Sequence, residues 1–433
     1  MKHAMDTDIA LYDWSPLLHL LLVGAAVAAL PLLWVWRRHR ARGAHGIMYA
    51  LTLMTLVLTF DLVMFGAFTR LTDSGLGCPD WPGCYGHASP VGAQAQISAA
   101  QQAQPDGPVT HKKAWIEMVH RYLATGVGAL IVVLTALAWR YWLRWGRQAK
   151  PASAEAQLSA DEPDATGINE EPQGLRTPVH PIWPTLTLAW VCLQGAFGAW
   201  TVTMKLFPAI VTLHLLGGMA LLALLGLQAA WWQQRVTGRR PVPVRPGHMV
   251  LALLVFVALF VQIALGGWVS TNYAVLACST FPDCNGAWWP QMDLGQGFTI
   301  WRELGHQGDG GLITFEALVG IHYVHRLFAL ALLMLGGWLV AVLWRHSKPL
   351  RRLAQGLLVL LVLQLLTGLA NVVLDWPLLV AVLHTGGAGA LVMVLTRVLA
   401  SMKMSKVCGT TPFFTESNLA RQVDTRRKKR GQA

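Results

Sequence analysis

Charged residues are scarce in this sequence. Only 13% of its 433 residues are Asp, Glu, Lys or Arg, which is about half of the share in a soluble globular domain. Long apolar runs take their place, and several reach the roughly 20 residues that a helix needs to cross a bilayer. The short alternating segments of a membrane barrel are missing. The sequence therefore predicts an all-α polytopic membrane protein.

We expect nine membrane-spanning helices, and basic residues cluster in alternate loops between them. By the positive-inside rule, this pattern puts the N-terminus outside and the C-terminus in the cytoplasm. The net charge of +12 belongs to these loops and to the tail. It indicates contact with anionic membrane lipid and no nucleic-acid partner. The expected spans are residues 15–36, 47–69, 116–142, 184–203, 209–232, 248–270, 319–344, 353–374 and 378–400.

The chain repeats its own pattern in order. The segment Cys78-Pro-Asp-Trp-Pro-Gly-Cys84 matches Cys278-Ser-Thr-Phe-Pro-Asp-Cys284. Further along, Glu117-Met-Val-His-Arg121 matches His322-Tyr-Val-His-Arg326. After these come two sets with identical internal spacing, Leu193-Gln194, Gly198 and Leu213-His214 in the first and Leu363-Gln364, Gly368 and Leu383-His384 in the second. Ordered matches of this kind predict two homologous four-helix bundles in a parallel repeat, with one extra N-terminal transmembrane helix.

This repeat divides the chain into four parts. Residues 1–46 hold the extra helix and a basic cytoplasmic loop, and residues 47–235 form the first four-helix unit. Within that unit, residues 151–182 are rich in Pro, Ala and acidic residues, which is typical of a disordered linker. Residues 236–400 form the second unit, and residues 401–433 form a basic cytoplasmic tail.

Four histidines occupy duplicated positions in the two units. They are His120 and His214 in the first, and His325 and His384 in the second. Each lies a few residues into a helix that enters from outside, so all four are roughly 8–10 Å below the outer surface. A single membrane histidine is usually a packing residue, but four at one depth favour metal ligation. Two facing imidazoles in a helix bundle can hold a haem iron.

Glu117 and His322 break the symmetry between the units. An acid beside one of two similar sites can relay protons or hydrogen-bond a substrate group, and a di-iron carboxylate site would need further Glu residues that the spans lack. His322 reads best as a hydrogen-bonded neighbour of the haem site. Three arginines near the outer helix ends could neutralise haem propionates or simply extend to the interface; they are Arg70, Arg121 and Arg326.

Four cysteines lie in the two loops expected outside, where disulfides persist. A disulfide would make each pair a structural clip, whereas a reduced pair could exchange redox equivalents with a partner. For Cys278 and Cys284 the clip is favoured, and for Cys78 and Cys84 both readings stay open.

Taken together, these motifs resemble the haem A synthase family over residues 47–400. The stretch from Phe68 to Cys84, the Glu-x-x-His-Arg motif and the two Leu-His-x-x-Gly-Gly sites carry the resemblance. The resemblance implies oxidation of a methyl group of haem O to a formyl group, by successive hydroxylations, giving haem A for terminal oxidases. It also implies a multi-pass protein of the bacterial inner membrane.

Roles for individual residues follow from the same resemblance. His120 and His214 would ligate the substrate haem O, while His325 and His384 would ligate a haem b cofactor. Glu117 matches the acid of the family, and the cysteine pairs match the family's loop disulfides, Cys78–Cys84 and Cys278–Cys284. The enzyme that produces haem O and an electron-transfer protein would be partners.

Two other functions remain open from the residues alone. A di-haem b-type electron-transfer subunit also needs two bis-histidine sites, although electron wires usually set their haems at different depths. A haem-handling or transport protein could use the same duplicated bundle. The single acid, Glu117, favours catalysis in one half.

Overall fold

A computed structural model describes residues 15–158 and 177–405 of the chain. Long helices dominate this part, and each of the nine expected spans lies inside one of them, apart from the last residue of the span 353–374, which follows the end of its helix. The long helices are α1 (Ser15–His39), α2 (Gly43–Leu71), α4 (His111–Leu158), α6 (Ile182–Thr203), α7 (Pro208–Thr237), α8 (Pro246–Thr271), α10 (Phe315–Trp344), α11 (Lys348–Val373) and α12 (Leu378–Ala400).

Eight segments of the described chain are long and apolar enough to cross a membrane. The first, Ser15–Leu71, has 57 residues and includes both α1 and α2. The short 3-10 helix η1 (Arg40–Arg42) separates the two, and Gly43 follows with a φ of 67°. Because η1 carries arginines that stay in water, the break between the two helices falls where the sequence predicts a loop.

Helix α4 is longer than the sequence predicts. It continues from the expected end at residue 142 to Leu158 and so covers the beginning of the expected linker. Ala154, Glu155 and Ala156 are good helix formers, and they extend the helix where no apolar period remains. Residues 159–176 of the expected linker, and the tail beyond residue 405, lie outside the described residues.

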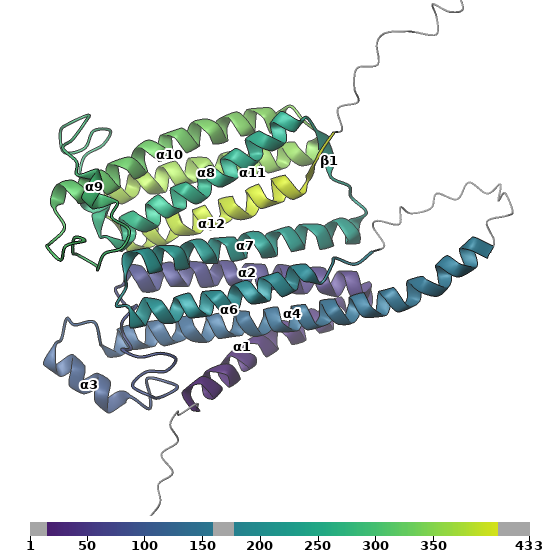
Figure 1. The fold of residues 1–433 in the computed structure, drawn as a ribbon, viewed down its shortest axis with the longest axis horizontal. Coiled ribbons are helices and arrows are strands. Elements are labelled where there is room, and N and C mark those ends of the chain that lie inside the picture. Colours follow the sequence, from purple (N-terminus) through teal and green to yellow (C-terminus); the bar gives the residue numbers. More distant parts are fainter. Residues whose placement is uncertain (1–14, 159–176, 406–433) are drawn as a thin grey trace, which may run out of the picture.

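The membrane helices form two groups. In the first half, α2, α4, α6 and α7 pack as neighbours around a ring, and in the second half α8, α10, α11 and α12 pack in the corresponding order. Figure 1 shows the second half above the first, with α7 and α12 between them. The halves meet through α7 with α12, α2 with α12, and α7 with α8.

Residues at equivalent repeat positions touch across this interface. Nη2 of Arg70 donates to the carbonyl of Ser270 at 2.7 Å, and the Tyr273 hydroxyl donates to Asp73 at 2.6 Å. Each pair is separated by 200 residues, which is also the offset between Cys78 and Cys278. The two halves are therefore related by an axis that passes close to the ends of α2 and α8.

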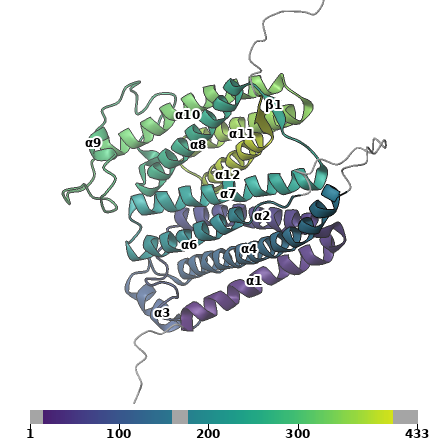
Figure 2. The same ribbon diagram turned by 45° about the vertical axis from the view of Figure 1, so that its right-hand side comes forward.

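The extra helix α1 covers one side of the first half. It packs mainly on α4 and also on α2 (Figure 2). A Cβ added to Gly24 would lie 2.4 Å from Thr125, so only glycine allows this close crossing. Leu20 is buried with Met118 and the cysteines Cys78 and Cys84. The face of α4 that carries Met118, Thr125 and Gly126 is thus covered by α1.

The loops gather at two opposite ends of the bundle. The short helices α3 (Gln94–Ala103), η2 (Ala274–Leu276) and α9 (Leu294–Gly297) belong to the two long loops, and Figure 1 shows α3 and α9 at one end. At the other end, strand β1 (Val242–Val244) pairs in parallel with β2 (Met402–Met404). This pairing ties the connection between the halves to the end of α12.

Candidate haem sites and the loops that cover them

Two long loops carry the cysteines. The first cysteine loop, residues 72–110, contains a disulfide between Cys78 and Cys84, and the second cysteine loop, residues 272–314, contains one between Cys278 and Cys284. Their Cα atoms are 4.9 and 4.7 Å apart, respectively. All four cysteines are fully buried. Each disulfide therefore closes a compact turn that sits on a helix of its own half.

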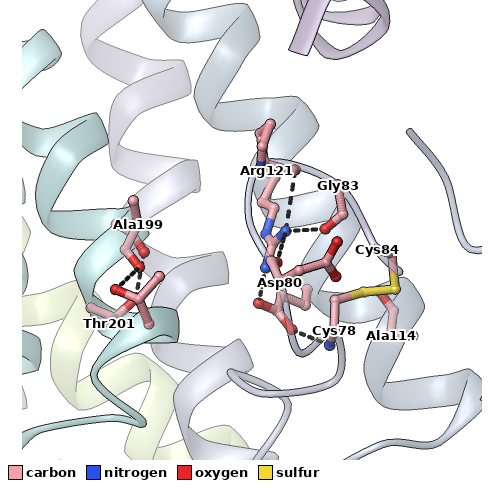
Figure 3. A network of polar contacts seen from close by, with 12 residues as sticks. Cys78, Asp80, Gly83, Cys84, Ala114, Arg121, Ala199 and Thr201 are labelled. Atoms are coloured by element: carbon pink, nitrogen blue, oxygen red, sulfur yellow. Dashed lines mark hydrogen bonds and ion pairs between the residues drawn. A yellow bond between two sulfur atoms is a disulfide. The ribbon is translucent and has the colours of Figure 1, made fainter. Parts of the chain in front are cut away.

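Glu117 and Arg121 hold the first cysteine loop on α4. The backbone N–H of Cys78 donates to Glu117 Oε2 at 2.8 Å, and Nη2 of Arg121 donates to Glu117 Oε1. Nη1 of Arg121 reaches the carbonyls of Asp80, Pro82 and Gly83 in the same loop (Figure 3). Glu117 and Arg121 are only 4% and 8% exposed. The pair is a buried ion pair that also fixes the loop backbone.

The second half uses the same positions with different chemistry. Nη1 and Nη2 of Arg326 donate to the carbonyls of Thr280, Asp283 and Cys278. His322 stands in the place of Glu117, with its Nδ1 3.3 Å from the Cys278 N–H and its Nε2 3.2 Å from Nε of Arg326. A carboxylate can accept both hydrogen bonds, whereas a neutral imidazole has a single acceptor nitrogen. The second loop is therefore held without a negative charge.

Each of the four histidines faces a glycine on the neighbouring helix of its own half. A Cβ added to Gly66 would lie 3.0 Å from His120, and one added to Gly266 would lie 3.0 Å from His325. The same additions at Gly198 and Gly368 would lie 3.5 Å from His214 and 3.2 Å from His384. All four imidazoles are half-buried. The glycines thus make room for side chains that enter the interior of each helix group.

The histidines of a half lie near each other. His120 is within electrostatic range of His214, and His325 is within range of His384. No group of three or more His, Cys, Asp or Glu side chains that could hold a metal ion occurs in residues 15–158 and 177–405. Each half thus offers two imidazoles, and a pair of neutral imidazoles fits a group that supplies its own remaining ligands, as a haem does.

The two pairs differ in what orients their rings. In the second half, Thr367 Oγ1 lies 2.8 Å from Nδ1 of His384, and the Gln262 amide lies 3.1 Å from Nδ1 of His325. Thr367 can accept the Nδ1–H of His384, which fixes that ring and leaves its Nε2 for a metal, whereas the Gln262 amide nitrogen is a donor and only positions the His325 ring. In the first half, Nδ1 of His214 is buried and has no hydrogen-bond partner among the described residues, and the ring of His120 stacks on Phe65. The imidazole rings of the second half are thus held by more hydrogen bonds than those of the first half.

A surface cavity of about 660 Å³ lies away from the histidines. It is in the second cysteine loop and is bordered by Trp289, Asp293, Thr314 and Glu316. None of the candidate ligands lines it. The geometry of the histidine pairs, rather than this cavity, marks the candidate site.

Sequence reasoning missed several residues that shape the site. The glycines opposite the histidines could be found from the sequence only in part: Gly66 and Gly266 stand at equivalent positions of the repeat, but nothing in the sequence shows that they contact histidines. The hydrogen bonds from Arg121 and Arg326 to loop carbonyls could not be predicted from the sequence, because every residue has a backbone carbonyl. The contacts of Arg70 with the second half were also missed. Its guanidinium donates to the carbonyl of Ser270 and lies 4.3 Å from the ring of Tyr273.

Comparison with known proteins places these features in one family. A family model described as cytochrome oxidase assembly protein matches residues 49–396. A Shewanella oneidensis protein named Heme A synthase is 38% identical over 351 residues, which cover 80% of this chain and 93% of the relative. Proteins of the same name from Halalkalibacterium halodurans and Caulobacter vibrioides are 26% and 28% identical, covering 75% and 78% of this chain and 86% and 91% of the relatives. The family match leaves α1 outside.

Proposed function

The chain belongs to the COX15-CtaA family of cytochrome oxidase assembly proteins, and from this premise we propose that each half binds one haem between its two histidines. The chain is an oxidoreductase of haem A biosynthesis that converts haem O to haem A. The proposal adds where the haems bind and what the surrounding residues do.

The first half takes the substrate, and the second half takes a resident haem b. His120 and His214 hold the iron of haem O, while His325 and His384 hold haem b. The difference in ring partners supports this assignment, because an ordered Nδ1 partner strengthens a ligand. Among the described residues, Thr367 supplies such an acceptor for His384 in the second half, whereas Nδ1 of His214 in the first half has no partner. A substrate must leave after the reaction, so the less constrained pair suits it.

A bound haem b supplies one-electron redox chemistry. The residues of the chain bind the haems, orient them and exclude water from them. Glu117 and Arg121 close the first cysteine loop over the half that holds His120. A closed loop keeps water from the methyl group that is oxidised to a formyl group by successive hydroxylations. We assign Glu117 first to this closure, and its direct contact with substrate stays a prediction.

The protein spans a membrane many times, and we assign it to the bacterial inner membrane with its cysteine loops outside. Support comes from charge, because the loops at the end that holds β1 are rich in arginine, including Arg239, Arg240 and Arg245. The N-terminus is then outside and the C-terminus cytoplasmic. The haem O-producing enzyme and an electron-transfer protein are the expected partners.

Extraction of the pigments tests the function directly. Cells that make haem O are compared with and without this protein, and the extracted haems are separated by chromatography. We expect haem A only when the protein is present, and haem b in the purified protein. Purified protein that carries two b-type haems, in cells without new haem A, would instead favour the di-haem electron-transfer subunit.

A further inference from the structure

Six buried polar side chains line the first half on the side of its histidines that we assign to the cytoplasm. On each helix they share a face with a histidine or with the glycine opposite one, because they lie 7, 11, 14 or 15 residues away from it. Each of these separations is close to a whole number of helical turns. The six residues form the polar column, which consists of Thr52, Thr55 and Thr59 on α2, Thr135 on α4, Thr187 on α6 and Gln228 on α7.

The equivalent positions of the second half are apolar and equally buried. On α8, the residues at the same distances from Gly266 are Ala252, Val255 and Leu259. The second half forms the same helix ring and the same histidine pair without any polar column, so the fold does not require one. The column therefore serves something that only the first half does. The other three apolar equivalents are Val340 on α10, Leu357 on α11 and Val398 on α12.

The threonines of α2 do not hold the helices together. Thr52 donates to the carbonyl of Met48 at 2.7 Å, Thr55 donates to that of Leu51 at 2.9 Å, and Thr59 donates to that of Thr55 at 2.7 Å. All three bonds stay within α2, whereas polar residues that join membrane helices bond across the interface. A hydroxyl oxygen that donates can still accept. The three hydroxyls thus present a row of acceptors to the interior of the first half.

The two glutamines on this face have acceptors that the protein leaves unused. The amide nitrogen of Gln228 donates to Thr187 Oγ1 at 2.7 Å and to the carbonyl of Leu224 at 3.0 Å. Its Oε1 is buried and has no partner among the described residues, and the same holds for Oε1 of Gln194. Gln228 is 1% exposed and Gln194 is 7% exposed. Buried acceptors in native proteins are almost always hydrogen-bonded, and ordered water is the partner where no protein group is.

Unused nitrogens lie at both ends of the column. At the outer end, Gln194 lies against Gly217, three residues after His214, whose Nδ1 has no partner in the described chain. At the cytoplasmic end, Nε2 of His45 is also buried without a partner there, and its ring lies 5.7 Å from that of Trp232, one turn beyond Gln228. Gln228 and His214 are separated by about 21 Å along α7. Polar atoms that need a partner therefore recur along the whole distance.

We propose that the polar column is a water-filled path that connects the cytoplasmic end of the first half with the substrate histidines. The inference rests on the proposed function, in which the first half holds haem O. Two hydroxylations of one methyl carbon give a geminal diol, and this diol loses one water molecule to become the formyl group. Glu117 and Arg121 close the outer side by holding the first cysteine loop, so this water leaves along the column. The second half converts no haem and stays dry.

Reaction of introduced cysteines with silver ions tests the path directly. Thr55→Cys and Val255→Cys place a thiol at equivalent buried positions of the two halves, in full-length protein in which Cys192 and Cys408 are replaced by serine. Ag⁺ is added to the cytoplasmic side of membrane vesicles, and the blocked fraction is measured by alkylation after denaturation. Only a thiolate binds Ag⁺, and apolar surroundings raise the pKa of a thiol. We expect Thr55→Cys to be blocked at least about tenfold faster than Val255→Cys.

A second set of variants separates the hydroxyl of Thr55 from its shape. Thr55→Val keeps the shape and removes the hydroxyl, so haem A formed per bound haem O should fall about tenfold, as for one lost hydrogen bond in the path. Thr55→Ser keeps the hydroxyl and should form haem A nearly as the wild type does. Thr203→Val is the matched control, because exposed Thr203 makes the same type of bond, to the carbonyl of Ala199, at the outer end of α6.

Thermal stability distinguishes the path from a packing role. Thr55→Val should be at least as stable as the wild type, since its apolar side chain has the same shape. Equal blocking rates at the two cysteines, or wild-type haem A formation by Thr55→Val, would overturn the path. The silver reaction does not depend on catalysis. A reactive Thr55→Cys in a protein whose wild type makes no haem A would therefore leave the path standing and count against the proposed function.

Discussion

Replacing Glu117 by alanine should release the first cysteine loop from α4. The substitution removes the acceptor of the Cys78 N–H and the only ion-pair partner of Arg121 in the described chain. Breaking a buried ion pair by removing one partner costs about 3–5 kcal/mol. Arg121 keeps three loop carbonyls, so we expect a loss near the lower end, about 3 kcal/mol. This corresponds to roughly a hundredfold in the opening equilibrium of the loop.

Two further variants separate charge from shape. Glu117→Gln keeps an oxygen for the Cys78 N–H but leaves Arg121 uncompensated, so it should cost about 1.5–3 kcal/mol. In the double variant Glu117→Ala/Arg121→Met the stranded charge is gone. Its loss should therefore be smaller than the sum of the two single losses, which is the signature of direct coupling.

The assay is alkylation of the cysteines under mild reducing conditions, mapped by mass spectrometry. Cys78 and Cys84 should become modified much faster in Glu117→Ala, whereas Cys278 and Cys284 in the same molecule provide the internal control. The ratio of haem A to haem O should fall in parallel, while haem b remains bound. Wild-type alkylation rates together with an unchanged haem ratio would refute both the loop closure and the assignment of Glu117.

The remaining predictions concern the histidine pairs. His384→Ala should remove the resident haem b more completely than His214→Ala, as measured by haem content per polypeptide; the opposite order would mean that the two halves are assigned the wrong way round. Gly266→Ala should also weaken haem b binding, because its Cβ would lie 3.0 Å from His325. Gly337→Ala, on the same helix as His325 and with nothing within 4 Å of the added Cβ, should bind haem b as the wild type does, and equal losses in both variants would rule out the steric explanation.

Much of the fold could be predicted because the bilayer limits the choices. An apolar run between basic loops can only be a spanning helix, and the nine expected spans coincide with helices for that reason. The end of α4 was missed, because residues such as Ala154 and Glu155 favour a helix by propensity alone. The pattern of apolar residues does not predict how far a helix continues beyond its membrane span.

The site was predicted less completely, and for a different reason. The histidines stand out because they are repeated at matching depth in apolar surroundings. The partners of Arg121 are backbone carbonyls about 40 residues away, and any sequence can provide those. Arg302 is only 3% exposed. Its burial could not be predicted either, because a single arginine in a long loop is usually solvated. Long-range contacts to backbone and buried charges in loops require the three-dimensional structure.

The contacts of Arg70 with Ser270 and of Asp73 with Tyr273 also bear on the origin of the molecule. Positions related by a twofold axis meet across it, as they do in a symmetric homodimer. In a dimer of identical chains, however, any change appears at both sites at once, so Glu117 and His322 could never coexist. Joining two copies into one polypeptide removes that restriction. Gene fusion would then be the step that allowed one ancestral haem site to keep a resident haem and the other to bind the substrate haem.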